Sequence, residues 1–325
     1  MRSPNFLAGS FALFAALTVA STGKAAESYP TKIIHIISPV PAGGLSDIAL
    51  RPLAHELSKR LGQPVIVDNR PGAGGVLAGR ACAQAQPDGY TICQLFNDTV
   101  INAPFLFKDV GYDAARDFAP ITNNFFITSG FIVTPELKVN TLQELIDLSK
   151  KRPEGINWGS PATTTTMFIE TLKQDTGANF VTIPYKSGGE VATAILTHAV
   201  DMIFAGIGNL VPYLQSGSLK ALAVEGTARS PLLPNVPTLK ETGYQGLRVQ
   251  AWYGFFAPAQ TPPDIIDRLH DEIVKIYQDP EFVQRTLTNA GLELALNTPS
   301  EFSRFLEEDR QKTAVLAKRA GVEPQ

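Results

Sequence analysis

The sequence predicts an α/β fold, in which strands and helices alternate along most of the chain. Short apolar runs recur at 32–38, 64–69, 90–96, 156–160, 179–185 and 201–205. Most of them lead through a turn rich in glycine or hydroxyl residues into a helical pattern. Strands that alternate with helices predict mainly parallel sheets with helices on both faces. The 325 residues, 44% of them hydrophobic, leave room for one large or two medium domains.

Residues 1–25 have the pattern of a secretory signal peptide. One arginine precedes the short apolar core "FLAGSFALFAALTVA", and small residues follow it. An uncleaved anchor is the alternative, but this core is shorter than the roughly 20 apolar residues that span a bilayer. We therefore expect cleavage near Ala25, a fold that begins near Tyr29, and a protein exported to the periplasm.

The first strand, 32–38, leads through the turn "PVPAGGLSD" into the first helix. Apolar residues follow the helical period of 3.6 at Leu50, Leu53, Ala54, Leu57 and Leu61. The second strand, 64–69, leads through "RPGAGG" into a helical stretch at 76–85. The third strand, 90–96, is followed by "NDT" and, we expect, a polar loop.

The two cysteines, Cys82 and Cys93, lie in the second helical stretch and the third strand. An exported protein meets an oxidising compartment, and a helix packed over the strand would bring the two residues together. A disulfide and a pair of buried thiols both remain open.

Three further strands lie in the middle of the chain. The strand at 156–160 leads through "PATTTT" to a helix at 167–177, and 179–185 leads through "KSGGE" to a helix at 191–199. The strand at 201–205 leads through "GIGN" to a helix at 210–217. Ligands of such sheets bind at the carboxyl ends of the strands, where backbone N–H groups at helix starts attract anions. Several such turns together favour a carboxylate site, although each glycine alone could serve only its turn.

Enzyme and cofactor motifs are missing from the sequence. It has no Walker loop and no Gly-x-Ser-x-Gly elbow, and "GAGGVL" at 72–77 lacks the last glycine of a dinucleotide fingerprint. The histidines, His35, His55, His198 and His270, do not have zinc-site spacing. The net charge is -3, and no basic block suits nucleic acid. We expect no catalytic residues, no metal, no cofactor and no nucleic-acid partner.

Several longer segments carry a family resemblance. They include "YPTKIIHIISPVPAGGLSDIALRPLAHELSKRLGQPVIVDNRPGAGG", "VTIPYKSGGEVATAIL" and "LKALAVEGTARSPLLPNVPTLKETG". With these segments the chain resembles the Bug (Bordetella uptake gene) or TctC family, the extracytoplasmic solute-binding receptors of tripartite tricarboxylate transporters. The similarity runs from about Tyr29 to the C-terminus.

The resemblance implies a two-lobed, type II-like periplasmic binding protein that closes over an organic anion like a Venus flytrap. It places the two chain crossings near residues 130 and 247. Lobe 1 would then comprise 27–130 and 248–325, and lobe 2 would comprise 131–247. It also implies a monomeric, non-enzymatic receptor that serves membrane permease subunits of the TctA/TctB type or a sensor protein.

The resemblance also implies which loops face the ligand. In the first loop and at the following helix start these are Val40, Pro41, Ala42, Gly43, Gly44 and Ser46. The other loops contribute Asn97, Thr99, Ser160, Thr163, Thr164, Tyr185, Ser187, Gly188, Ala205 and Gly206. We expect Gly43 and Gly44 to leave backbone N–H groups free for the anion. A carboxylate would repel that anion, so Asp47 is expected to cap the helix, while Lys186 could add charge or simply be exposed.

Two departures from the family pattern bear on the ligand. Val40 stands where an aromatic residue is usual, and the strand at 201–205 runs on to Ala205 and Gly206 where many members have an aspartate-asparagine pair. Without that aspartate, an amino-acid ligand would lose a charge-assisted bond of about 1.5 to 3 kcal/mol. We therefore predict a mono- or dicarboxylate without an amino group, on an apolar or aromatic body that suits the threonine-rich turn.

An exported serine- or threonine-dependent hydrolase is the alternative function. It requires a base beside Ser160 or Thr163, and the sequence shows none nearby. Only folding that brings His198 or Lys186 close to them would supply it.

Overall fold

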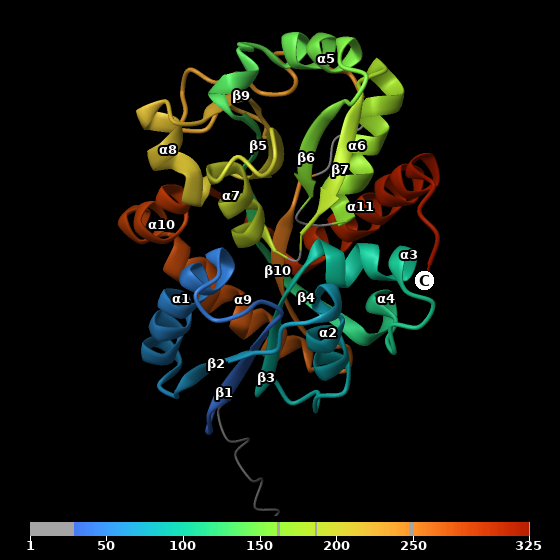
Figure 1. The fold of residues 1–325 in the computed structure, drawn as a ribbon. Coiled ribbons are helices and arrows are strands. Elements are labelled where there is room, and N and C mark those ends of the chain that lie inside the picture. Colours follow the sequence, from blue (N-terminus) through green and yellow to red (C-terminus); the bar gives the residue numbers. More distant parts are fainter. Residues whose placement is uncertain (1–28, 161–162, 186, 247–249, 325) are drawn as a thin grey trace, which may run out of the picture.

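The computed structural model describes residues 29–160, 163–185, 187–246 and 250–324. It forms two lobes, one above the other in Figure 1, each built on one β-sheet with helices around it. Lobe 1 is the six-stranded sheet with its helices, and lobe 2 is the five-stranded sheet with its helices. No helix in the described ranges is long and apolar enough to cross a membrane.

The sheet of lobe 1 has the strand order β11-β4-β10-β3-β1-β2. Its strands are β1 (Ile34–Ser38), β2 (Val65–Asn69), β3 (Thr91–Phe96), β4 (Phe118–Ile127), β10 (Trp252–Pro258) and β11 (Leu292–Leu294). β1 pairs in parallel with β2 and β3, whereas β10 is antiparallel to β3 and β4. The first three strands therefore lie where the sequence predicts them.

The sheet of lobe 2 has the order β7-β6-β8-β5-β9. Its strands are β5 (Ser129–Val133), β6 (Ile156–Ser160), β7 (Phe180–Pro184), β8 (Met202–Gly206) and β9 (Lys220–Val224). β6 pairs in parallel with β7 and β8, while β5 is antiparallel to β8 and β9. The chain passes from one sheet to the other between β4 and β5 and returns between β9 and β10.

The predicted two-lobed α/β fold, with helices around each sheet, is confirmed, and antiparallel strands make both sheets mixed. The antiparallel strands β5 and β10 are the first strands formed after the chain changes lobe. The preceding strands, β4 and β9, end where the lobes meet, so the next strand starts there and runs away from the junction. The βαβ strands of each sheet run toward the junction, which brings their carboxyl ends together from both sides.

The helices cover both sheets (Figure 1). Those that lie mainly on lobe 1 are α1 (Leu45–Leu61), α2 (Val76–Ala83), α3 (Ala103–Leu106), α4 (Ala114–Asp117), α9 (Pro263–Tyr277), α10 (Pro280–Thr286) and α11 (Pro299–Ala320). Lobe 2 carries α5 (Leu142–Lys151), α6 (Thr163–Thr176), α7 (Gly188–Leu196) and α8 (Val211–Ser216). Short helical turns are η1 (Ala73–Gly75), η2 (Asp98–Asn102), η3 (Pro135–Leu137), η4 (Gly208–Leu210) and η5 (Thr288–Ala290). The polar loop expected after β3 is instead helical, because Val100 and Ile101 are buried in the lobe 1 core.

The core of lobe 1 lies on both faces of its sheet. On one face, Leu50, Leu53 and Leu57 of α1 are fully buried together with Leu269 of α9, as the helical period predicts. On the other face, a disulfide joins Cys82 of α2 to Cys93 of β3, with an S–S distance of 2.09 Å. Of the two states that the sequence left open, the structure therefore has the disulfide.

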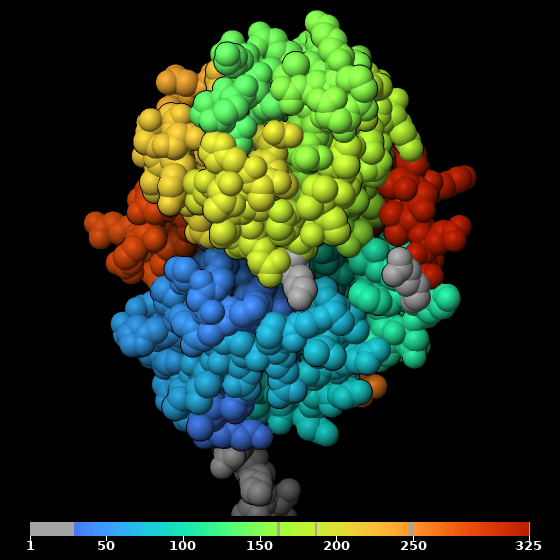
Figure 2. All heavy atoms as spheres, viewed as in Figure 1, coloured from blue at the N-terminus to red at the C-terminus, as the bar shows by residue number. Residues whose placement is uncertain are grey.

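The last helix, α11, links the two lobes. Phe302 and Leu306 near its start belong to the core of lobe 1, whereas Leu316 and Ala317 near its end belong to the core of lobe 2. It packs against α6 of lobe 2, and Figures 1 and 2 show it in red beside the boundary between the lobes. The C-terminal segment thus contacts lobe 2 as well as lobe 1.

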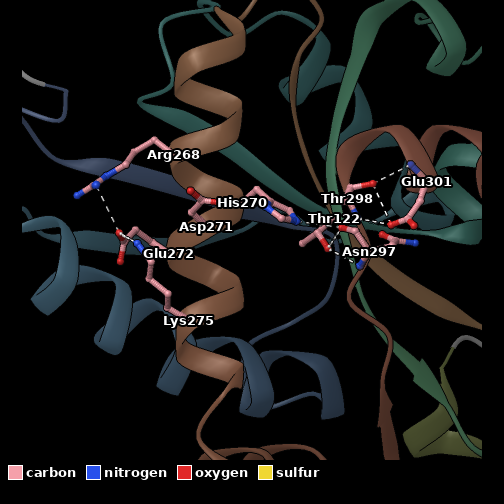
Figure 3. Close-up of polar contacts among 9 residues, drawn as sticks. All are labelled: Thr122, Arg268, His270, Asp271, Glu272, Lys275, Asn297, Thr298 and Glu301. Carbon is pink, nitrogen blue, oxygen red and sulfur yellow. Dashed lines mark hydrogen bonds and ion pairs between the residues drawn. The ribbon is translucent and has the colours of Figure 1, made fainter.

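A buried carboxylate anchors α9 on lobe 1. Glu272 is only 4% exposed, and it accepts hydrogen bonds from Arg60 Nε at 2.7 Å and Lys275 Nζ at 3.0 Å. Arg268 Nη1 lies 3.5 Å away on the same helix (Figure 3). Burial alone would raise the pKa of Glu272, but these cations outweigh it, and the pKa lies below its usual range.

The segment before α11 is fixed by a second group of polar contacts, also drawn in Figure 3. The carbonyl oxygen of Asn297 accepts from His270 Nε2 at 3.1 Å and from the Thr122 hydroxyl at 2.8 Å. Thr298 and Glu301 then form a reciprocal capping box at the start of α11. His270 therefore has a structural role between α9 and the β11–α11 segment.

Candidate functional site

The start of α1 faces the end of β8 across the boundary between the lobes. A methyl group placed on Gly206 would lie 2.9 Å from Ile127 Cγ2 and 3.9 Å from Leu45 Cδ2. The next glycine, Gly208, has the carbonyl oxygen of Ala290 and Leu45 Cδ1 as close neighbours. Lobe 1 therefore reaches Gly206, one of the predicted site residues, with no room for a larger side chain.

The first loop satisfies its own glycine N–H groups. Gly43 N donates to Asp47 Oδ2 at 2.8 Å, and Gly44 N donates to the Pro41 carbonyl at 3.2 Å. The expectation that both glycines leave free N–H groups is therefore wrong, and Pro41, Ala42 and Gly43 are exposed. The first N–H groups of α1, at Leu45 and Ser46, have no acceptor within the helix.

Asp47 stabilises the first loop from the third position of α1. The N-cap residue is Gly44, so the expectation that Asp47 caps the helix is corrected. Its carboxylate, 1% exposed, accepts from Arg51 Nε and Asn69 Nδ2 at 2.8 Å as well as from Gly43. Burial would raise the pKa of Asp47, but these donors outweigh it and lower the pKa. Asp47 thus ties the loop to α1 and β2 as a charged group.

A group of hydrogen bonds joins lobe 1 to lobe 2 at the end of β3. Thr164 Oγ1, in the first turn of α6, donates to Asp98 Oδ1 at 2.5 Å and accepts from Asn97 Nδ2 at 2.9 Å. Asn102 Nδ2 donates to Asp98 Oδ1 at 2.5 Å and also to Thr164 Oγ1. We call Asn97, Asp98, Asn102 and Thr164 the junction cluster.

Asp98 is a buried carboxyl without a cation beside it. It is 7% exposed, and the described ion pairs do not include it. Burial raises its pKa, although donors from the Thr164 and Asn102 side chains and the Thr164 backbone N–H act in the other direction. The sequence analysis passed over Asp98 between Asn97 and Thr99. Its position in a polar turn after a buried strand was the available signal.

Tyr253 of β10 connects the start of α1 with the junction cluster. Burial raises the pKa of Tyr253 to about 12, and both the Ser46 side chain and the Asp98 carboxylate act on it. Ser46, Tyr253 and Asp98 are therefore neighbours, and all three are buried. The structure thus brings Ser46 and Asn97 of lobe 1 to the same boundary as Thr164 of lobe 2.

Three buried polar atoms near the junction cluster have no hydrogen-bond partner among the described residues. They are Ser38 Oγ at the end of β1, Thr99 Oγ1 and Asn102 Oδ1. A methyl group on Gly75 would collide with Thr99 Oγ1, so only glycine fits beside this hydroxyl. Buried polar groups without a protein partner bind water or a ligand.

Other predicted residues lie farther from the junction cluster or have structural roles. Ser187 Oγ accepts from the Glu190 N–H and caps α7, and both Ser187 and Gly188 are exposed. Tyr185 and Ser187 line a shallow pocket of about 510 Å³ on the surface of lobe 2. Val40 is half-buried against the lobe 1 core, and Ala205 is buried in the lobe 2 core. Lys186 lies outside the described residues.

The hydroxyl groups considered for hydrolysis are not placed beside the described candidate base. Ser160 Oγ forms a 2.5 Å hydrogen bond with Thr166 Oγ1, and Thr163 lies at the half-buried start of α6. His198 Nδ1 lies 3.6 Å from Glu136 Oε2, and both side chains are exposed. Across the described ranges, no three His, Cys, Asp or Glu side chains gather in the manner of a metal site.

The chain matches known proteins along most of its length. Residues 49–322 match the TctC model, described as the tripartite tricarboxylate transporter family receptor. A Cupriavidus necator protein from the gbd 5' region is 34% identical over 91% of this chain and 90% of its own length. BugT of Bordetella pertussis is 30% identical over 91% of this chain and 92% of its own length.

Solved structures with the same fold include proteins with bound organic acids. The periplasmic binding protein BugD is 32% identical, with a TM-score of 0.79 over 91% of this chain and all of its own. An R. palustris protein with adipate is 27% identical, with a TM-score of 0.83 over 91% of this chain and 100% of its own. MatC from Rhodopseudomonas palustris, with bound malate, is 26% identical, with a TM-score of 0.77 over 89% of this chain and 100% of its own.

Proposed function

This chain belongs to the family of tripartite tricarboxylate transporter receptors, and from that premise we propose that it captures a small organic acid between its two lobes in the periplasm. It then delivers the acid to membrane permease subunits or to a sensor protein. The observation that carries this proposal is the junction cluster, where the end of β3 in lobe 1 bonds to the start of α6 in lobe 2. A site between two lobes lets a ligand stabilise the closed form by touching both.

The groups at the boundary suit a carboxylate. The starts of α1 and α6 supply backbone N–H donors and the positive ends of helix dipoles. Ser46 and Thr99 add hydroxyl groups, whereas the hydroxyl of Thr164 donates to Asp98, and the junction cluster contains no arginine or lysine. Recognition by backbone and hydroxyl donors accepts an anion without demanding one fixed shape, so the ligand's body is selected by other contacts.

The ligand we propose is a mono- or dicarboxylate without an amino group. An ammonium group needs an ionised carboxylate, and β8 ends at Ala205 and Gly206, which offer none. The carboxyl that does lie at the boundary, Asp98, is favoured in its neutral form by burial. Adipate and malate, present in two related structures, belong to the class of acids without an amino group.

A thermal-shift panel tests this proposal on the purified protein. The panel contains adipate, malate, benzoate, L-aspartate and L-glutamate, because malate and L-aspartate differ only in a hydroxyl or an ammonium group. A ligand at 100 times its dissociation constant stabilises the folded state by about 2.7 kcal/mol, which a melting curve detects. We expect at least one acid without an amino group to raise Tm. Stabilisation by the amino acids alone would contradict the ligand class, and no shift with any carboxylate would contradict the function.

The matched variants for this panel are Gly206→Val and Gly217→Val. Gly206 faces Leu45 across the boundary, whereas Gly217 ends α8 on lobe 2 with no atom within 4 Å of an added methyl group. Gly217 has a φ of +79°, so its variant reports the cost of backbone strain alone. We expect only Gly206→Val to lose the ligand-induced shift. A retained shift in a folded Gly206→Val protein would remove the end of β8 from the site.

A further inference from the structure

Asp98 occupies a position that suits the carboxylate of a ligand. It is the first residue of η2 in lobe 1, yet its carboxyl group accepts from the hydroxyl and the backbone N–H of Thr164 in the first turn of α6. The N-terminus of a 14-residue helix carries a partial positive charge that favours an anion. An incoming carboxylate therefore meets a site where a carboxyl group of the protein already lies.

The hydrogen bonds of the junction cluster fix which oxygen of Asp98 can hold a proton. Thr164 Oγ1 accepts from Asn97 Nδ2 and from Asn102 Nδ2, which uses both of its lone pairs. Its single hydrogen must then point to Asp98 Oδ1, which also accepts from Asn102. The Thr164 backbone N–H also donates to this carboxyl group. Because Oδ1 already accepts two side-chain hydrogen bonds, we infer that a proton on this carboxyl group lies on Oδ2.

Unpartnered buried atoms next to Asp98 indicate that something outside the chain completes the site. Thr99 is fully buried and its Oγ1 has no partner, and Asn102 is 1% exposed with its Oδ1 unpartnered. One is a hydroxyl that can donate, and the other is a carbonyl oxygen that accepts. Together with Oδ2–H of Asp98, they offer two donors and one acceptor, which suits a carboxylate and a neighbouring hydroxyl group.

Within the described ranges, charged groups on the elements around η2 do not compensate Asp98. The titratable neighbours are Tyr253 on β10 and Tyr112, whose hydroxyl donates to the Thr99 carbonyl oxygen. Both are neutral at physiological pH because burial raises the pKa of each. Arg80 on α2 donates to the carbonyl oxygen of Val110, and Asp309 on α11 accepts from Trp252 Nε1. Burial, opposed only by the donors of Thr164 and Asn102, raises the pKa of Asp98.

We propose that Asp98 is a specificity-determining residue, which admits an organic acid only together with one proton. The ligand arrives as a carboxylate and lies beside Oδ2 of Asp98. When Asp98 is ionised, one proton from solvent binds to Oδ2 as the ligand binds, and it returns to solvent when the ligand leaves. Two ionised carboxyl groups side by side would repel each other, so the shared proton is the condition for binding. This inference rests on the proposed function. It adds that the ligand carboxylate binds together with one proton.

The inference predicts pH-dependent affinity. Above the pKa of Asp98 in the free protein, each rise of one pH unit lowers the fraction of protein molecules with protonated Asp98 about tenfold. The dissociation constant of an organic acid therefore rises about tenfold per pH unit in that range. An amino-acid ligand behaves oppositely, because its ammonium group pairs with the ionised form.

Calorimetry with malate and adipate as probes tests the proton directly. Titrations at pH 6, 7 and 8, each in two buffers with different enthalpies of ionisation, count the protons taken up per ligand bound. We expect uptake to approach one proton in the wild type and to vanish in Asp98→Asn, whose affinity no longer depends on pH. The control Asp309→Asn removes another aspartate whose pKa is raised by burial, and it keeps the proton uptake. Binding without proton uptake in the wild type, unchanged uptake in Asp98→Asn, or binding of L-aspartate with Asp98 ionised would overturn the inference.

A measurement without ligand separates this inference from the proposed function. If neither probe binds, the proposed function loses its support, and the pH dependence of unfolding then decides about Asp98. An aspartate with a raised pKa contributes stability that is present below its unfolded-state pKa of about 3.9 and is lost as pH rises through the folded-state pKa. We expect Tm of the wild type to fall relative to Asp98→Asn between pH 4 and pH 8. A difference in Tm that stays constant over this range would overturn the inference.

Discussion

Two carboxyl groups of this molecule are buried to the same degree in opposite surroundings. Glu272 on α9 is 4% exposed and is paired with Arg60 and with Lys275 and Arg268, the last two drawn in Figure 3. Asp98, at the boundary between the lobes, is 7% exposed and is met by the neutral donors of Thr164 and Asn102. Although burial raises the pKa of both, the cations reverse its effect at Glu272 alone.

The difference separates a structural carboxylate from the one that we propose as part of a ligand site. The charge of Glu272 is compensated within lobe 1, so it stabilises the packing of α9 on α1 and needs nothing from outside. Asp98 lies among atoms that have no partner in the chain, Thr99 Oγ1 and Asn102 Oδ1. Burial alone therefore does not identify a functional carboxyl group, and Asp98 is a candidate because unpartnered polar atoms lie beside it as well.

The largest expected effect on stability comes from removing the compensated carboxylate. Glu272→Gln leaves three cations without their acceptor charge, and we expect the free energy of unfolding at pH 7 to fall by about 2 kcal/mol, a value reduced by the solvent exposure of those cations. Urea unfolding measures it. Because the pKa of Glu272 is lowered, this difference is present above about pH 4.3, the unfolded-state pKa, and is lost as pH falls through the folded-state pKa.

The matched control for Glu272→Gln is Asp267→Asn on the same helix, where the side chain is exposed. Its effect should stay within about 0.5 kcal/mol. Equal losses in the two variants would mean that the cations around Glu272 contribute no specific stabilisation, and the contrast with Asp98 would then be lost.

A smaller effect is expected at the start of α11, in the same part of lobe 1. Thr298→Ala removes one half of the capping box with Glu301, and we expect a loss of about 1 kcal/mol in the free energy of unfolding. Ser303→Ala, an exposed change one turn later in α11, serves as the reference. This region lies outside the site that we propose, so the ligand-induced Tm shift should stay the same in both variants. A reduced shift in Thr298→Ala would extend the site to α11.

Local patterns predicted the strands and helices that follow the βαβ order. The helical period predicted which face of α1 packs on the sheet, the face with Leu50, Leu53 and Leu57. The strands β1 to β3 and β6 to β8 also lie at the predicted apolar runs. The antiparallel strands β5 and β10 were not among the predicted runs, and their direction follows from the crossing between lobes, which leaves no periodic signal. The helix α6 also starts four residues earlier than predicted, at Thr163.

The sequence placed the candidate residues in loops at the ends of strands, but it did not predict the contacts that these residues make. Asn97 and Thr164 meet because two sheets point their strand ends at each other, and 67 positions separate them in the chain. The N–H groups of Gly43 and Gly44 looked available in sequence, yet Asp47 and Pro41 accept them within the loop. The raised pKa of Asp98 depends on its burial and on the lack of nearby cations among the described residues. Both depend on the three-dimensional arrangement, so the sequence could not show them.

The central claim, that Asp98 is an uncompensated carboxyl group and Glu272 a compensated one, is tested most directly by carboxyl ¹³C NMR titration of the full protein. Asp98→Asn and Glu272→Gln assign the two signals. The account predicts that Asp98 titrates clearly above the usual aspartate pKa of about 3.9 and Glu272 below the usual glutamate pKa of about 4.3. An Asp98 signal that titrates at or below 3.9 would contradict it.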